Sequence, residues 1–591
     1  SPARTDRSEQ GFGRFSGTGR WRPLEDGPGQ AEMEIELERS AAAEVAILVA
    51  GRDLGLQGRV AARVFLNGPP TAMKIRGRLV IEGFDRGGRF APRGKEWVLP
   101  FEGTFDGELQ SIQLSTVDGE QEGPSPFSIL LSASSLLSRP EVEAAFSLDG
   151  LPATTFLDIA RRLGAETPRG FSMDGTLHGA LALPRDGPFN GEVELRDSEV
   201  RLGDAGPVSI RAAIVRMAGG AVELLPAELV TPSGATAELA GRWSAGAGAL
   251  AFQARFPSLP LDELNTALRQ LPASAAPAPL RSCRGGMLGG SLRFDYLPEQ
   301  SDGAWAANLL LQNVLCQTPG LPQPVLLLRA PLTVRGREWS LRGATVRWQS
   351  VDAIVSARNP VSIARPVTIS VQTPALPANL LEQVLRPAFE RRSTLLDRTL
   401  GRPSPPPEWV AARDLELDFA ASRVLLGEDT FQQFRLRAFW RGPTIDLPMV
   451  EFQHEDANFT GGGAIRLDGE APEYRIAGRL DRLPYRNAFV DASLALRASG
   501  FGRDLLDRLR IDGRADARNL SLDGLRLDWL AACFDYDASR IDGRRLHLSC
   551  IEARAGTEYF LSEPAQGSLQ GLQLELESPR RSVVAAWPPK P

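Results

Sequence analysis

The sequence predicts a mostly β fold, an antiparallel meander of strands with one short helix in each repeat of about 110 residues. Three observations lead to this prediction. Short segments alternate apolar and charged residues, turn residues separate these segments, and a Leu-Pro step recurs along the chain. Successive side chains of a strand point to opposite faces of a sheet, so each alternating segment has one apolar and one charged face.

The alternating segments supply candidate residues for the apolar face. From Met33 to Leu37, and again from Leu415 to Phe419, each intervening residue is acidic. Turn sequences such as Arg185-Asp186-Gly187-Pro188 and Asp468-Gly469 separate the strands. We call the following the lining residues: Met33, Ile35, Leu37, Val193, Leu195, Val208, Ile210, Leu415, Leu417, Phe419, Phe434, Leu436, Ile465, Leu467, Leu572, Leu574 and Leu576.

The Leu-Pro step marks the repeat. It occurs at Leu151, Leu259, Leu376 and Leu483, at intervals of 108, 117 and 107 residues. Proline is favoured in the first turn of a helix, and residues with helical apolar spacing follow the first three steps, so we expect a helix after each of the four. The segment Ser40–Val49 resembles an earlier helix of the same series.

These intervals divide the chain into repeats. Residues 1–31 are expected to form an initial strand and loop. The predicted repeats are 32–150, 151–258, 259–375, 376–482 with a Pro-rich helical insertion at 386–407, and a C-terminal repeat and cap at 483–591.

Composition and motifs argue against several function classes. The chain of 591 residues carries 67 basic and 73 acidic residues, a balance that does not suggest a nucleic-acid partner. Three histidines leave little for catalysis or metal binding, and the glycines around Gly94-Lys95 have the wrong spacing for a P-loop. GxSxG and HExxH motifs are missing. We therefore expect no enzyme, no cofactor and no metal.

No apolar run reaches the 18 residues that a membrane-spanning helix needs, and the chain opens on Ser1-Pro2-Ala3 without a methionine. We expect a processed chain whose targeting or anchoring segment has been removed.

The four cysteines form two close pairs in the sequence. Cys283 and Cys316 are 33 residues apart, and Cys533 and Cys550 are 17 apart. An even number fits two disulfides in an oxidising compartment, and buried free thiols are the alternative.

At this level of detail the chain resembles the AsmA/TamB-like proteins of Gram-negative-type envelopes. The resemblance spans about residues 30–580 and depends on the period and on the order strand, Leu-Pro, helix. One repeat carries it in full, through the segments 175–179, 191–198, 207–210, 237–241 and 257–261.

The resemblance implies an elongated, twisted, taco-like repeating β-groove, apolar inside and hydrophilic outside. It also implies a periplasmic monomer, anchored in the inner membrane by an N-terminal helix that this chain lacks. Such a protein would carry phospholipid between the inner and outer membranes and support outer-membrane biogenesis, with the membranes or their proteins as partners.

The residues alone leave alternatives open. A single sheet with one apolar face either packs on itself as a sandwich or stays open for apolar ligands. The helices are either gates over the groove or simple packing elements. A rival function is an envelope scaffold or assembly factor that pairs its sheet edge with strands of outer-membrane β-barrel clients. A parallel β-helix would need a period of about 20–25 residues, which the sequence does not have.

Overall fold

The computed structural model confirms a mostly β protein, with 72% of residues in strands and 9% in helices. The residues that it describes are 14–25, 27–50, 55–86, 96–118, 126–136, 141–162, 170–185, 187–203, 206–244, 246–269, 282–298, 303–318, 320–360, 365–389, 407–485, 488–522, 525–540, 545–568 and 572–587.

The described strands belong to one open sheet of 35 strands. The chain divides into two compact units. Unit 1 is Ser1–Pro277 with Leu288–Ala306, and unit 2 is Ala278–Met287 with Ala307–Pro591.

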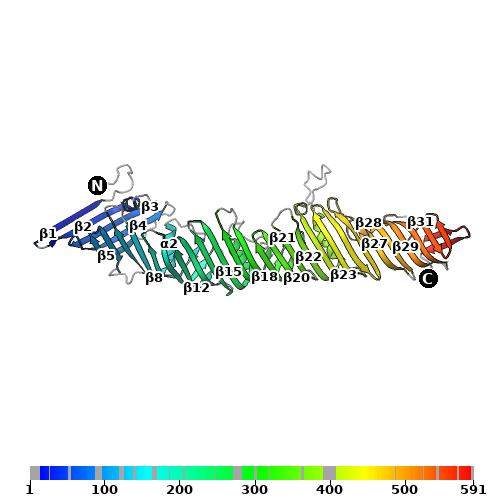
Figure 1. The fold of residues 1–591 in the computed structure, drawn as a ribbon, viewed down its shortest axis with the longest axis horizontal. Coiled ribbons are helices and arrows are strands. Elements are labelled where there is room, and N and C mark those ends of the chain that lie inside the picture. The colour runs from blue at the N-terminus through cyan, green and yellow to red at the C-terminus, as the bar shows by residue number, and fades with distance from the viewer. Residues whose placement is uncertain are drawn as a thin grey trace. The chain divides into compact units, whose positions relative to one another are not determined.

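Unit 1 is an antiparallel meander in which successive long strands of the chain pair with each other (Figure 1). Its strands are β1 (Phe15–Leu24), β2 (Gly27–Ala41), β3 (Leu56–Gly68), β4 (Met73–Arg86), β5 (Glu96–Asp106), β6 (Ser111–Thr116), β7 (Phe127–Ser134), β8 (Glu141–Pro152), β9 (Ser172–Met173), β10 (Thr176–Leu183), β11 (Asn190–Arg201), β12 (Val208–Ala218), β13 (Ala221–Val230), β14 (Thr236–Ser244), β15 (Ala249–Pro260) and β17 (Met287–Tyr296).

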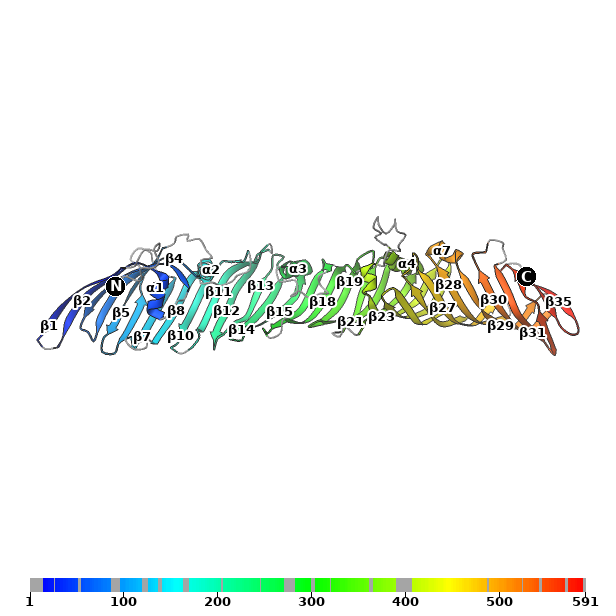
Figure 2. The same cartoon turned by 90° about the horizontal axis from the view of Figure 1, so that it is seen from above.

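In the described part of unit 1, three helices interrupt this meander, each directly after a strand. They are α1 (Ala42–Ala50), α2 (Ala153–Arg162) and α3 (Leu261–Arg269). The Leu-Pro steps at Leu151 and Leu259 end β8 and β15, so the helices predicted there are confirmed. Figure 2 places α2 and α3 along the same side of the unit 1 strands.

Unit 2 holds the remaining strands: β16 (Cys283–Arg284), β18 (Ala304–Cys316), β19 (Val325–Arg335), β20 (Glu338–Trp348), β21 (Val351–Asn359), β22 (Val367–Pro377), β23 (Asp414–Leu426), β24 (Asp429–Arg441), β25 (Thr444–His454), β26 (Ala457–Arg466), β27 (Glu473–Tyr485), β28 (Ala488–Ser499), β29 (Arg510–Leu522), β30 (Leu525–Asp537), β31 (Leu546–Ala555), β32 (Glu558–Ser562), β33 (Ala565–Gly567), β34 (Leu572–Glu577) and β35 (Ser582–Trp587). Among its described residues, the helical elements are α4 (Ala378–Leu385), the 3-10 helix η2 (Arg386–Phe389), α6 (Glu408–Ala411) and α7 (Gly502–Asp507).

One step of the unit 2 meander is parallel. β22 and β23 run in the same direction, with Val367 opposite Leu415 and Pro377 opposite Leu425. A parallel pair needs a connection that returns from the C-terminal end of one strand to the N-terminal end of the next. The helices α4, η2 and α6 lie on that connection. The prediction of a uniformly antiparallel meander is wrong here, because apolar alternation is the same for both strand directions.

The helix predicted after Leu483-Pro484 is also wrong. These residues lie at the end of β27, opposite Val490 and Phe489 of β28, and the helix α7 begins one strand later at Gly502. Residues 488–499 are rich in apolar alternation and pair with β27 and β29, so strand pairing overrides the helix signal of the proline. The step at Leu376 is followed by α4 as predicted.

Register defines the two faces of the sheet. In unit 1, Leu37 lies opposite Ala62, Ala62 opposite Leu79, and Leu79 opposite Leu99. Residues directly opposite each other on paired strands share a face. We call the face of these residues, and the equivalent apolar face of unit 2, the inner face, and the opposite one the outer face.

Candidate functional site

The inner face of unit 1 is apolar across four neighbouring strands. From β2 to β5, its positions between Met33 and Leu37 and their cross-strand partners are all apolar residues or glycine. These positions are Met33, Ile35, Leu37, Ala62, Val64, Leu66, Ile75, Gly77, Leu79, Leu99, Phe101 and Gly103. This part of the sheet therefore offers an unbroken apolar surface.

Protein covers this surface only in part. Met33 is 40% exposed, and Leu66, Leu79, Leu99 and Phe101 are half-buried. Ile75, in contrast, is buried. A folded protein normally buries a contiguous apolar face against another layer, so a face on which Met33 is exposed and Leu66, Leu79, Leu99 and Phe101 are only partly covered is typical of a binding surface.

The outer face of the same strands carries charge. Arg63 Nε donates a hydrogen bond of 2.7 Å to Glu34 Oε1, and Arg39 Nη2 lies 2.8 Å from Glu82 Oε1. Exposed pairs of this kind contribute little to stability, but they keep the outer face hydrated. The sheet thus has one hydrated and one apolar side, as the alternation predicts.

In unit 2, residues from opposite ends of the strands meet over the inner face. The register places the loop before β19, which contains Gly320, at the same end of the strands as the C-terminal end of β22. Trp409 lies just before β23, which begins at the opposite end of the strands. Even so, the Trp409 ring lies against Gly320, where a Cβ would sit 2.7 Å from Cζ3. This contact brings residues from opposite ends of the strands together on the inner side of the sheet.

The C-terminal strands of unit 2 close on their own apolar residues, and we call this region the cap. The inner residues of β29 to β35 form one cluster in which Phe560, Leu522, Leu576 and Ala585 are fully buried. β35 also contacts β29. The inner face is therefore filled by protein at this end.

The structure places the lining residues in different surroundings. Met33 is exposed, and the half-buried ones are Ile35, Leu37, Val208, Ile210, Leu417, Phe419, Phe434, Leu436 and Ile465. The buried ones are Val193, Leu195, Leu415, Leu467, Leu574 and Leu576. The side chain of Leu572 lies outside the described residues. Leu574 and Leu576 belong to the cap, whereas Ile35 and Leu37 belong to the partly exposed surface of unit 1.

Sequence reasoning missed the inner residues of β3, β4 and β5. In β4 the run from Met73 to Leu79 alternates cleanly and could have been found. In β3, Phe65 places an apolar side chain on the outer face beside Leu66 on the inner face, which hides the alternation.

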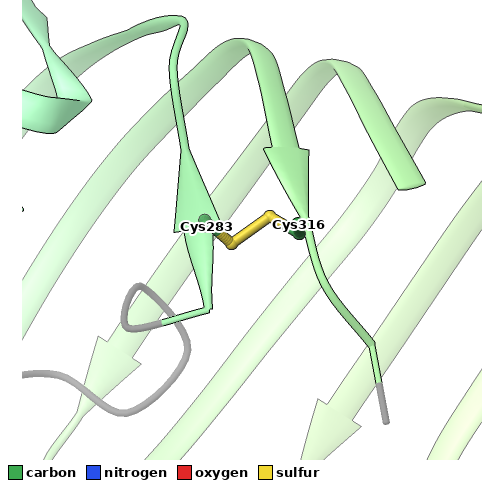
Figure 3. The surroundings of a disulfide bond; sticks show 2 residues. All are labelled: Cys283 and Cys316. Atoms are coloured by element: carbon green, nitrogen blue, oxygen red, sulfur yellow. A yellow bond between two sulfur atoms is a disulfide. The ribbon is translucent and has the colours of Figure 1, made fainter. Parts of the chain in front are cut away.

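Cys283 and Cys316 form a disulfide between β16 and β18 (Figure 3). They lie directly opposite each other in the register, with their Cα atoms 4.0 Å apart. One of the two pairings that the sequence suggested is thus present in the structure.

We expect loss of this disulfide to destabilise the first strands of unit 2. It joins residues separated by 33 positions, and the entropy of the closed loop corresponds to about 3–4 kcal/mol. Cys316→Ser should increase hydrogen exchange in β16 and β18, whereas Cys550→Ser, which removes an exposed free thiol, should not. Unchanged exchange in Cys316→Ser would contradict this prediction.

The other two cysteines are free thiols in the structure. Cys533 lies opposite Ser549, beside the bulge that holds Cys550. A hydrogen bond with the Cys550 thiol, followed by burial, raises the pKa of Cys533.

This contact predicts a pH-dependent difference in reactivity. Because a raised pKa leaves less thiolate at pH 8, Cys533 should be alkylated more slowly than its ordinary pKa implies. Cys550→Ala removes the main cause, so the alkylation of Cys533 at pH 8 should accelerate and its rate profile should move to lower pH. Peptide mass spectrometry after timed alkylation measures both. A profile that does not move in Cys550→Ala would refute the role of Cys550.

The histidines are far apart along the chain. His178 Nδ1 lies 3.3 Å from Asp149 Oδ1, and the His454 ring packs at a tilt against Phe431 with ring centres 5.1 Å apart. Within the described part of the chain, no three His, Cys, Asp or Glu residues are grouped so that they could hold a metal ion. No helix among the described residues is long and apolar enough to span a membrane.

No family model, curated protein or solved structure matches the chain.

Proposed function

We propose that the inner face of unit 1 binds the acyl chains of phospholipids, and that the protein moves phospholipid between the inner and outer membranes of a Gram-negative-type envelope. In this role it supports outer-membrane biogenesis. The observation that carries the proposal is the partly exposed apolar face of β2 to β5.

The chemistry of that face favours hydrocarbon. Its positions from Met33 to Leu37 and their partners offer no hydrogen-bonding or charged side chain, so a ligand bound there has to be apolar over its whole contact. Each CH₂ group that becomes fully buried on binding contributes about 0.8 kcal/mol. The charged headgroups would stay in water beside the edges of the strands.

The dimensions also suit lipid. The inner residues of β4 from Met73 to Ile81 are apolar or glycine, and this stretch extends about 27 Å along the strand. That length is sufficient for an acyl chain to lie along the inner face.

The proposed location is the periplasm, with anchoring in the inner membrane through a segment outside this sequence. The disulfide between Cys283 and Cys316 supports an oxidising compartment. The proposed partners are phospholipid and the membranes or their proteins, and the protein acts as a monomer without catalysis.

A transfer assay tests this function. Donor vesicles carry a fluorescent phospholipid with a quencher, and unlabelled acceptor vesicles receive it. We expect the protein to raise the rate of dequenching above the spontaneous rate, in proportion to its concentration. A rate equal to that with heat-denatured protein would contradict the proposal.

A second candidate function has one observation in its favour. All ten residues of β1 are exposed, and in the described part of the chain β1 pairs with β2 alone. An unpaired strand edge can accept a strand of another protein, such as an outer-membrane β-barrel client.

Proline substitution at the edge tests this second function. Prolines at Thr18 or Gly19 remove neighbouring N–H groups, one of which points away from β2. If β1 captures clients, one of these variants should lose client binding and keep phospholipid transfer. If neither variant reduces client binding, or if both activities fall together, the edge has no such role.

A further inference from the structure

The connection between β22 and β23 crosses the inner face of unit 2. It starts where β22 ends, at Pro377, and returns to the opposite end of the strands, where β23 begins at Asp414. Its described residues are 378–389 and 407–413, and we call them the crossover. The next connections, at residues 427–428 and 442–443, are tight turns that stay at one end of the strands, whereas the crossover passes from one end to the other and so can cover a face.

The first part of the crossover packs onto inner residues. Leu380 of α4 is buried together with Leu376, Ala421 and Val424, and Phe434 packs against this cluster. Further along, Ala388 of η2 is fully buried in a second cluster. That cluster contains the inner residues Ala438, Ile445, Leu447, Val450 and Phe459 of β24, β25 and β26.

The second part closes the other side. Val410 of α6 is fully buried in the same cluster as Ala388. Beside it, Trp409 and Trp440 meet edge to face at 6.0 Å, and the guanidinium of Arg413 lies 4.9 Å from the Trp409 ring centre. Since Trp409 also touches Gly320, the crossover contacts segments from both ends of the unit 2 strands.

The far end of α4 and η2 reaches the strands beyond β26. Phe389 contacts Phe501, which precedes α7, with ring centres 5.5 Å apart. Burial, with a smaller contribution from the Glu382 carboxylate of α4, raises the pKa of Tyr474 in β27 to about 12. The crossover therefore extends over the sheet from β22 to β27.

We infer that the crossover occupies the inner face of β23 to β26 in the position that acyl chains would take, so that phospholipid contacts unit 1 and is excluded from this part of unit 2. The part of this inference that concerns lipid on unit 1 rests on the proposed function. The part that concerns unit 2 rests only on the burial of Leu380, Ala388 and Val410. The consequence is that the lipid-binding face is limited by the chain's own residues and does not continue into the cap.

Photo-crosslinking from four phenylalanine positions tests the inference. Phe101 and Phe434 lie on the inner faces of units 1 and 2, and Phe65 and Phe439 lie on the matching outer faces. Each is replaced singly by p-benzoylphenylalanine, which keeps the phenylalanine ring and adds a photoreactive benzoyl group at its para position. The full-length variants are incubated with vesicles of radiolabelled phosphatidylethanolamine and phosphatidylglycerol, irradiated, and analysed by gel and peptide mass spectrometry.

We expect radiolabel on the Phe101 variant and at least tenfold less on the Phe65, Phe434 and Phe439 variants. The Phe434 variant should instead give an intramolecular crosslink to a peptide from residues 378–389 or 407–413. Circular dichroism confirms that each variant is folded before it is scored.

The outcomes separate the inference from the function. Label on Phe434 equal to that on Phe101 would overturn the inference and leave lipid binding intact. No label at any position would refute the proposed function, and the intramolecular crosslink of Phe434 would then still decide whether the crossover fills unit 2. The absence of that crosslink in a folded variant would overturn the inference.

Discussion

Replacing Phe560 with alanine is expected to destabilise the cap by about 3–5 kcal/mol. Phe560 is fully buried among Leu522, Ile551 and Leu576, and the guanidinium of Arg581 lies 5.7 Å from its ring centre. Loss of the ring leaves a cavity in a cluster that holds the terminal strands together. Hydrogen exchange in β31, β32 and β34 should rise by two orders of magnitude or more, because each 1.4 kcal/mol corresponds to about a factor of ten.

Tyr559→Ala is the matched control. Tyr559 is the preceding residue of the same strand, but it is 47% exposed. We expect its replacement to change the exchange of the cap by less than tenfold. Similar effects of the two substitutions would show that the terminal strands are not held by an apolar core.

Leu99→Asp is expected to reduce phospholipid binding by about tenfold or more, because an unpaired carboxylate against hydrocarbon costs several kcal/mol. Leu99 lies on the inner face of β5, opposite Leu79, and is half-buried. The measurement is the phospholipid retained per chain after incubation with vesicles and removal of the vesicles by flotation. The variant should remain folded at the temperature of the measurement, so that unfolding does not explain its loss of lipid.

Val98→Asp controls for the charge itself. Val98 is the neighbouring residue on the outer face, opposite Val80, and is 48% exposed. Its replacement should leave lipid retention within twofold of the original protein. If both variants lose lipid equally, the ligand does not contact the inner face of β5.

Much of the fold was predictable because its local signals agree. In the repeat from 151 to 258, the Leu-Pro step predicted α2, and the alternating residues Val193, Leu195, Val208 and Ile210 predicted strands that the structure has as β11 and β12. The same signals failed at Pro484, where the residues of β28 pair on both sides. They also failed at β23, whose alternating residues Leu415 and Phe419 read the same in either direction.

The candidate site was less predictable than the fold. Alternation indicates that Leu37 and Leu576 each belong to an apolar face, but it does not indicate what covers that face. In the structure Leu37 is half-buried, whereas Leu576 is fully buried in the cap. The difference arises from contacts between strands far apart in the sequence, such as β29 and β35, which local patterns do not encode. The same holds for Ala388 and Val410, which are buried only because the chain crosses the sheet.

The occupant of the unit 1 inner face is the central claim, and native mass spectrometry of the full chain measures it most directly. The protein is purified without detergent from an envelope fraction and sprayed under non-denaturing conditions. We predict masses of the chain plus one or more phospholipids, which disappear on collisional activation and are strongly reduced in Leu99→Asp. A spectrum containing only the mass of the bare chain, from protein that circular dichroism shows to be folded, would contradict the account.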